Sequence, residues 1–167
     1  MALPNIFMQL VFEGTPLPGD AAVEGYKGQI VLDSLSWDVS ATHKPMPDDK
    51  VKTEWRAESI KASKVFDRAS TTLYSNMKAR QNFDKALITV VDTTLVNGVP
   101  IKMMELEVKN GFVESISTKA SDAGSVMSIG ESISLSFDEG TLRYYPSADT
   151  GRGEATTFPM PKMRSGS

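Results

Sequence analysis

The chain has 167 residues, of which 40% are hydrophobic and 23% charged, values typical of one globular domain with its own core. Its 18 basic and 21 acidic side chains give a formal net charge of −3, so charge offers no reason to expect nucleic acid or an anionic membrane as the main partner. The sequence contains no apolar window long enough for a membrane-spanning helix, and we expect no membrane insertion. Because there is no cysteine, disulfides, thiolate metal sites and cysteine nucleophiles are excluded.

The N-terminal segment, residues 1–7, lacks the positive region and the small-residue cleavage site of a secretory signal peptide. We therefore expect the protein to be made and folded in the cytoplasm. The absence of cysteine suits that reducing compartment, and it equally suits a protein that later crosses into an oxidising one.

The first third of the chain predicts strands separated by turns. Residues 5–12 predict one strand, residues 29–40 a second and residues 53–63 a third. In the second strand two sets alternate, with Leu35, Trp37 and Val39 on one face and Ser34, Ser36 and Asp38 on the other. This period of two is typical of a strand with one buried face and one wet face.

Residues 41–52, between the second and third predicted strands, hold two prolines and five charged side chains. Proline cannot donate a ladder hydrogen bond, so this segment is not expected to form a central strand. Its length and composition predict a protruding loop.

One helix is predicted, over residues 70–80. Ser70 is a candidate N-cap, and Lys78 and Arg80 suit the negative end of the helix dipole. The expected apolar stripe consists of Leu73, Tyr74 and Met77.

The second half of the chain again predicts strands. Residues 86–95 and 99–108 flank Val96-Asn97-Gly98, a strong hairpin signal, and Asn110-Gly111 is a second signal of the same kind. Residues 131–145 place Ser132, Ser134 and Ser136 opposite Ile133, Leu135 and Phe137. Of the polar tail, residues 162–167 are expected to be loose. Together the elements predict a single mostly β domain over residues 1–167, a compact barrel or sandwich of about seven strands with one packed helix.

The sequence offers no catalytic or metal centre. His43 is the only histidine, and in a predicted loop it is expected to be a solvated side chain. Asp48-Asp49 lacks the spaced oxygens and central glycine of a calcium loop. The glycines form no phosphate-binding series. We therefore predict a protein that is not an enzyme and that uses no cofactor.

Two predicted strands carry small polar faces: Ser34, Ser36 and Asp38 on one, and Ser132, Ser134 and Ser136 on the other. For a single strand, the simpler interpretation is a solvent-facing surface of a monomer. The alternative is the lining of a wet cavity or channel. Because a mostly β protein has edges that must be covered or used, contact between an edge and a different patch on a neighbouring copy would form a ring if the rotation closes.

The run Gly28 to Ser40 resembles the signature second strand of the Hcp family, the tube proteins of type VI secretion. In that family a Gly-x-Ile-x-x-x-Ser-x-x-Trp-like strand follows a glycine-flanked loop. The likeness continues, in the same order, through residues 67–73, 101–117, 131–137 and 144–146. Matches in sequence order over about residues 5–146 are more specific than any single motif.

The resemblance implies a compact β-barrel of two packed antiparallel sheets with one flanking helix, six copies of which form a ring. Rings would stack into a hollow tube that is wrapped by a contractile sheath, tipped by a VgrG-type spike and expelled to the extracellular space or a target cell. Effector cargo would occupy the lumen. The candidate lumen-facing residues are Ser34, Ser36, Asp38, Ser132, Ser134 and Ser136. The candidate inter-subunit residues in the loop are His43, Lys44, Pro45, Met46, Pro47, Asp48, Asp49 and Lys50.

Some residues depart from the family pattern. Thr71 stands where many members carry proline, the second strand ends in Asp38-Val39, and the tail after Tyr145 lacks the usual tryptophan-containing ending. At Asn110-Gly111 the family pattern favours one bent strand with Gly111 as a bulge over a hairpin. Two alternatives remain open, a contractile phage tail tube of the same fold and a monomeric β-barrel that binds a small apolar ligand.

Overall fold

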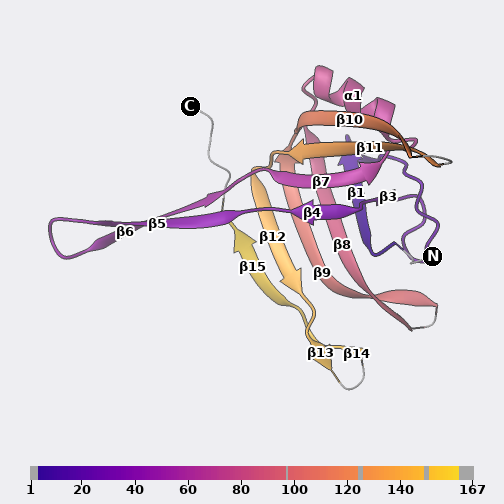
Figure 1. Ribbon diagram of the computed structural model, residues 1–167. Helices are drawn as coiled ribbons and strands as arrows, with labels where there is room; N and C mark the ends of the chain where they lie inside the picture. The colour runs from indigo at the N-terminus through magenta and orange to yellow at the C-terminus, as the bar shows by residue number, and fades with distance from the viewer. Residues whose placement is uncertain (1–3, 97, 124–125, 149–150, 162–167) are drawn as a thin grey trace.

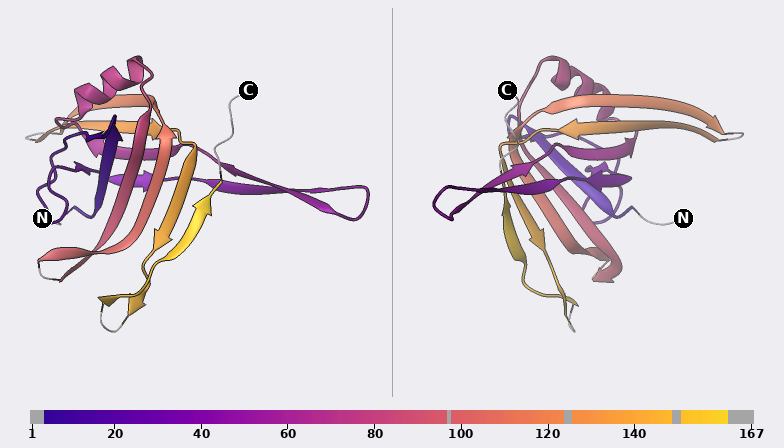
Figure 2. Two further views of the ribbon diagram at one scale, coloured as in Figure 1. Left: turned by 180° about the vertical axis from the view of Figure 1, so that it is seen from behind. Right: turned by 60° about the vertical axis from the view of Figure 1, so that its left-hand side comes forward.

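The computed structural model describes residues 4–96, 98–123, 126–148 and 151–161. Most of them form antiparallel strands, and the helix among them is α1 (Ser70–Lys78). Figure 1 shows two layers of crossing strands, with α1 beside the upper layer and one long hairpin reaching away from the body. Two further views show the same arrangement (Figure 2).

The larger layer, sheet A, has the strand order β15-β12-β9-β8-β1-β2, and β3 also pairs with β1. Its strands are β1 (Ile6–Phe12), β2 (Thr15–Pro16), β3 (Ile30–Val31), β8 (Phe83–Val96), β9 (Val99–Gly111), β12 (Glu139–Tyr144) and β15 (Thr156–Met160). The smaller layer, sheet B, has the order β10-β11-β7-β4. Its strands are β4 (Ser34–Ser36), β7 (Ile60–Val65), β10 (Val113–Ala123) and β11 (Val126–Leu135). Two separate pairs are β5 (Val39–Pro45) with β6 (Val51–Ala57), and β13 (Ser147–Ala148) with β14 (Gly151–Arg152).

The core lies between sheets A and B. Side chains from both layers are fully or almost fully buried in one cluster that also includes Leu73 of α1: Leu10, Ile88 and Leu106 from sheet A, and Ile60, Ile133 and Leu135 from sheet B. Burying one such side chain stabilises a fold by about 1.5–3 kcal/mol.

The predicted mostly β fold, with antiparallel sheets and one short helix, is confirmed. Closure into a barrel is not seen, because the described pairings divide the strands among separate sheets.

The long strand predicted over residues 29–40 is wrong, because three short strands replace it. β3 pairs with β1, β4 pairs with β7, and β5 pairs with β6. The chain crosses from one sheet to the other at Leu32 and Asp33, whose N–H groups donate to Ile6 and Ser63 respectively. The strand predicted over 53–63 is likewise divided, between β6 and β7.

The loop predicted over residues 41–52 is also wrong in detail, although it does protrude. It is the distal part of the β5–β6 ribbon, and Met46 N–H donates to the Lys50 carbonyl across its turn. Pro45 is tolerated opposite Val51 because both edges of a two-stranded ribbon face solvent, so the missing N–H interrupts no sheet.

The hairpin predicted between residues 86–108 is confirmed as β8–β9, although its Asn97 lies outside the described residues.

At Asn110-Gly111 the local hairpin signal is wrong, since β9 lies in sheet A and β10 in sheet B. Asn110 has a φ of 55°, and a Cβ on Gly111 would collide with the Ser136 carbonyl. The bent path through Gly111 is confirmed, but the register shift falls between Val113 and Ser115.

The polar tail contributes one strand to sheet A. β15 pairs with β12 along five residues and forms one edge of sheet A. Residues 162–167, which were expected to be loose, lie outside the described residues.

The helix starts differently from the prediction, because Ser70 is its first residue rather than its cap. Asp67 Oδ1 accepts the Ala69 N–H at 2.9 Å, and the buried Ser70 hydroxyl accepts the Asp67 N–H at 2.9 Å. This local exchange satisfies N–H groups at the helix start that have no partner within the helix.

A buried ion cluster joins this helix start to sheet B. Lys64 stands directly opposite Glu131 in the β7–β11 ladder, and both side chains are fully buried. Lys64 Nζ lies 3.1 Å from Glu131 Oε1, 3.0 Å from Asp67 Oδ1 and 3.0 Å from Ser70 Oγ. Two carboxylates therefore depend on one buried ammonium group.

Replacing Lys64 with methionine should lower the free energy of unfolding by about 3–5 kcal/mol, because two buried carboxylates lose their counter-charge. Chemical denaturation measures the change. Lys61→Met is the matched control, since Lys61 lies on the same strand but is exposed; its cost should be about 0.5 kcal/mol or less. Equal costs for the two variants would contradict the role of the cluster.

A second polar contact joins Tyr145, the residue after β12, to Glu105 on the neighbouring strand β9. The Tyr145 hydroxyl donates to the carboxylate of Glu105, which is buried. This hydrogen bond, together with burial and the Glu105 charge, raises the pKa of Tyr145 to about 12. Burial and the same carboxylate also raise the pKa of Tyr26, which stacks on Phe7 with ring centroids 4.6 Å apart.

The raised pKa of Tyr145 predicts a loss of stability at high pH. An unfolded tyrosine ionises near pH 10, so the contribution is complete below about pH 10 and is lost as the pH rises towards about 12. The free energy of unfolding, measured from pH 8 to 12, should fall more steeply for the native chain than for Tyr145→Phe. Parallel curves would show that the contact does not act on stability.

Candidate assembly surfaces

The central part of the outer face of sheet B is lined mainly by serine. The strand register places side chains from all four strands opposite one another in two ladders. The first ladder is Ser117, Ser132, Ser63 and Ser34, and the second is Ser115, Ser134, Lys61 and Ser36. Ser63 and Ser134 are half-buried, and the other six side chains are exposed. We call this surface the serine face.

The serine face follows from the way sheet B packs. Ala62, Ile133 and Leu35 alternate with the serines and point to the core, so the serines must point outwards. The ladders border a shallow hollow of about 250 Å³. Within them Ser34 Oγ lies 2.5 Å from Ser63 Oγ, and Lys61 is the one charged side chain. The result is a broad surface of small hydroxyl groups.

Four of the six predicted lumen-facing residues, Ser34, Ser36, Ser132 and Ser134, meet on the serine face. The other two lie elsewhere. The Ser136 hydroxyl accepts the Phe112 N–H at the corner between the sheets, and Asp38 is exposed at the start of the hairpin. The prediction missed Ser63, Ser115 and Ser117. The predicted strand over residues 112–117 contains Ser115-Ile116-Ser117, which alternates in the same way as the two strands whose serines were assigned to the lumen.

The second surface is the β5–β6 ribbon, residues 39–57, which we call the arm. Within the described residues its two strands pair only with each other. The register gives it two unlike faces. One face carries Val39, Ala41, His43, Pro45, Val51, Thr53, Trp55 and Ala57, and the other carries Ser40, Thr42, Lys44, Lys52, Glu54 and Arg56. Figures 1 and 2 show the arm extending far from both sheets.

The less polar face of the arm is largely uncovered. Val51 is 63% exposed and Trp55 is 56% exposed, and Met46 in the turn is 46% exposed. A two-stranded ribbon is marginally stable in water unless it packs against something further. Within the described residues, this face of the arm is therefore an apolar surface without a covering partner.

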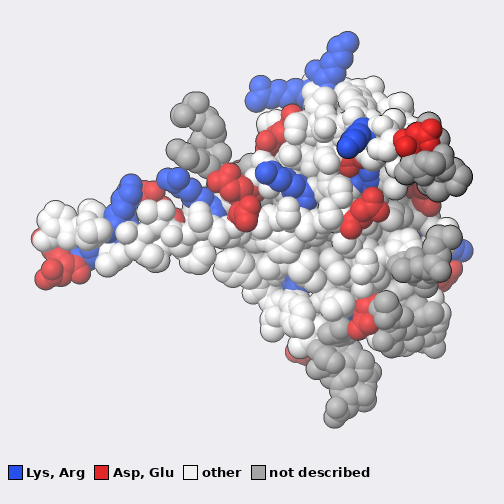
Figure 3. All heavy atoms as spheres, in the orientation of Figure 1, with Lys and Arg blue, Asp and Glu red and all other residues white. Residues whose placement is uncertain are grey.

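The other face of the arm is charged, as the mixed colours along it in Figure 3 show. Lys44 stands directly opposite Lys52, and Glu54 lies 3.6 Å from Lys52 and 3.5 Å from Arg56. The charge of Lys44, followed by that of Lys52, holds the pKa of the Glu54 carboxyl below its usual range. Such exposed pairs contribute little to stability, so they do not compensate for the uncovered apolar face.

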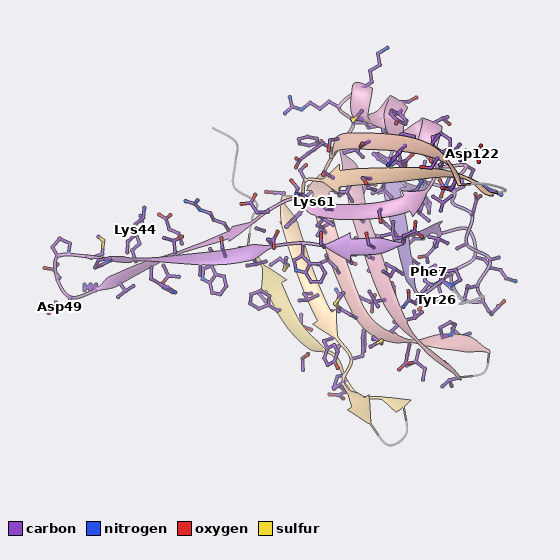
Figure 4. All side chains as sticks on the ribbon, in the orientation of Figure 1. Phe7, Tyr26, Lys44, Asp49, Lys61 and Asp122 are labelled. Atoms are coloured by element: carbon purple, nitrogen blue, oxygen red, sulfur yellow. The ribbon has the colours of Figure 1, made fainter. Side chains whose placement is uncertain are left out.

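The other predicted contact residues lie near the tip of the arm, where Figure 4 labels Lys44 and Asp49. Asp48 and Asp49 are exposed in the turn, and Asp49 has a φ of 57°. His43 Nδ1 lies 2.9 Å from Thr53 Oγ1 across the ribbon, in an exposed pair. In the described ranges no three His, Cys, Asp or Glu side chains are grouped to hold a metal ion. No helix in these ranges is long and apolar enough to cross a membrane.

Comparisons with known proteins identify the family. The family model "Type VI secretion system effector, Hcp" matches residues 7–144. Among solved structures, one titled "Structure of a type six secretion system protein" superposes with a TM-score of 0.74 at 17% identity and covers 93% of each chain. Hcp1 from the E. coli EAEC 042 pathovar gives a TM-score of 0.73 at 16% identity, covering 95% of this chain and 99% of that one. Hcp1 from Salmonella typhimurium gives 0.68 at 18% identity, covering 92% of each.

At such identities the superpositions show a shared fold, whereas the family model shows the family. A search of curated proteins gives no match. The family match favours a type VI system over the two alternatives, a phage tail tube and a monomeric ligand-binding barrel. The family is structural and not enzymatic, and its members are secreted through the type VI system. The chain belongs to the Hcp family and is a type VI secretion tube protein.

Proposed function

We propose that six copies of this chain form a ring, and that rings stack into the exported inner tube with the serine face lining its lumen. The observation that carries the proposal is the pair of ladders that crosses all four strands of sheet B. The arm is the inter-subunit clasp. In this proposal residues 1–167 act as one tube domain.

The position of sheet B supports a wall-forming role. Its inner face is buried against sheet A, its outer face is the serine face, and β4 and β10 form its two edges. α1 packs against β10, where the Tyr74 and Thr118 hydroxyls are hydrogen-bonded. The β4 edge and this helix-covered edge lie on opposite sides of sheet B and allow head-to-tail contact with two neighbours, the geometry that closes a ring. Unpaired edges also need covering in a mostly β protein.

The chemistry of the serine face supports a role as lumen wall. Small hydroxyl groups keep such a wall wet, and they present neither an apolar patch that would retain a passing polypeptide nor a dense field of charge. Two lysines give each subunit a modest positive charge there. Lys61 lies in the second ladder, and Lys119 stands opposite Gly130 in the next row. Effector cargo in the lumen is part of the proposal, as are contacts of the tube with a VgrG-type spike and a contractile sheath.

Ring formation is the first test of this function. The purified chain at high concentration should show rings in electron micrographs and a hexamer-sized peak in size-exclusion chromatography. Assembly depends on protein concentration, so a dilution series is required. A chain that stays monomeric throughout the series would contradict the proposal.

Ser36→Trp tests the assignment of the serine face. Ser36 is exposed in the second ladder, so rings should form normally while indole groups from every subunit obstruct the lumen and reduce cargo retention and transport. Electron microscopy and a secretion assay measure the two effects. Ser75→Trp, at an exposed position of α1, is the control and should change neither. Rings lost only in Ser36→Trp would place Ser36 in an interface instead.

Val51→Ser tests the arm. The side chain is exposed in the isolated chain, so its replacement should leave the unfolding midpoint of the monomer unchanged. If a neighbour buries it, the concentration of half-assembly should rise by roughly ten- to hundredfold, given about 1.5–3 kcal/mol for a buried valine. Lys52→Ser, the next residue on the other face of the arm, is the matched control. Equal shifts for both variants would contradict burial of the less polar face.

A further inference from the structure

Beyond its base the arm contacts the body at an aromatic pair. Trp55 on β6 and Phe158 on β15 lie with ring centroids 6.0 Å apart and ring planes tilted by 51°. Neither ring belongs to the buried core, and Phe158 is 41% exposed. The pair joins the arm to the C-terminal edge strand of sheet A.

The base of the arm does little to fix the orientation of the arm relative to the body. The two strands leave the body where Val39 pairs with Ala57, and Glu58 N–H donates to the Asp38 carbonyl at 2.9 Å just below that pair. Ala57 is buried, whereas every residue of β5 after Val39 is exposed. The base is thus a narrow attachment of two adjacent chain segments, about which a ribbon can pivot.

Trp55 lies just beyond this attachment, because it pairs with Ala41, the third pair from the base. The four pairs that follow carry the tip roughly 13 Å further, at about 3.3 Å per residue. A small rotation at the base therefore becomes a large displacement of the contact residues near the tip. A contact at Trp55 is well placed to prevent that rotation.

β15 brings Phe158 to this position. Phe158 stands opposite Leu142, which in turn stands opposite the buried Leu106, so its ring lies on the inner face of sheet A. Met160, two residues further on the same face of β15, is buried in the core, whereas the Phe158 ring lies outside the core and contacts the arm. In Figures 1 and 2 β15 runs up to the base of the arm.

We propose that Phe158 is a positioning residue that braces the arm through Trp55, so that the C-terminal strand sets the direction in which the arm meets a neighbouring subunit. The inference rests on the proposed role of the arm as a clasp. The proposal gives a role to the tail after Tyr145, where this chain departs from the Hcp sequence pattern. Aromatic pairs contribute about 0.5–1.5 kcal/mol beyond burial, which corresponds to roughly a two- to tenfold change in an equilibrium.

The first test is spectroscopic and does not require rings. In a Trp37→Phe background Trp55 is the sole tryptophan of the chain. In dilute protein, Phe158→Ala should shift the Trp55 emission to longer wavelength and lower its anisotropy, while Phe158→Tyr should restore both. Thr157→Ala, at the neighbouring exposed position of β15, should change neither. Unchanged Trp55 emission and anisotropy in Phe158→Ala would overturn the brace.

The second test separates a brace from two independent interface contacts. The concentration of half-assembly is measured for Phe158→Ala, Trp55→Ala and the double variant. A brace predicts a two- to tenfold increase for Phe158→Ala and little further increase when Trp55 is already absent. Independent contacts predict additive free energies, and that result would overturn the inference. If the native chain forms no ring, the proposed function fails, and the spectroscopic test still decides whether the brace exists.

Discussion

The alternation of side chains along sheet B is the constraint on which the rest of the structure depends. Its apolar set, which includes Ile133 and Leu135, must face sheet A because the two layers share one core. Because side chains alternate with a period of two, the serines point to the opposite, outer face of the sheet. A register slip of one residue would bury hydroxyl groups and expose the core. The serine face is therefore held in place by the same burial that stabilises the fold.

The Lys64–Glu131 pair is the charged exception on the buried side of the same sheet. Burying these charges is costly, and an apolar pair of similar volume would often be at least as stable. What the pair contributes is a specific position for the elements that it joins. Lys64 also binds Asp67 and Ser70, so one ammonium group joins the β7–β11 register to the start of α1. A purely apolar contact would not fix the helix start so specifically.

Only the ends of the arm and of the C-terminal strand reach this core, through Ala57 and Met160. An isolated ribbon with a 56% exposed tryptophan gains little from its own pairing. Beyond its base the arm contacts the body where Trp55 meets Phe158 on β15, and in our proposal a neighbouring subunit covers its remaining apolar side chains. The protein thus combines a two-layer body that shares one core with a long two-stranded arm whose apolar side chains stay largely exposed.

The sequence by itself determined the mostly β class, the helix near residues 70–78, the β8–β9 hairpin and the outward direction of Ser34, Ser36, Ser132 and Ser134. These features depend on local periodicity and turn residues, which are readable along one strand. Only the tertiary structure decided that residues 29–40 belong to three pairings, that residues 41–52 form a ribbon, and that Ser63, Ser115 and Ser117 complete the serine face. Which strands pair in a sheet depends on burial between segments far apart in sequence, and no local pattern predicts that pairing. The Trp55–Phe158 contact has the same cause, since the two rings meet only after sheet A has placed β15 beside the base of the arm.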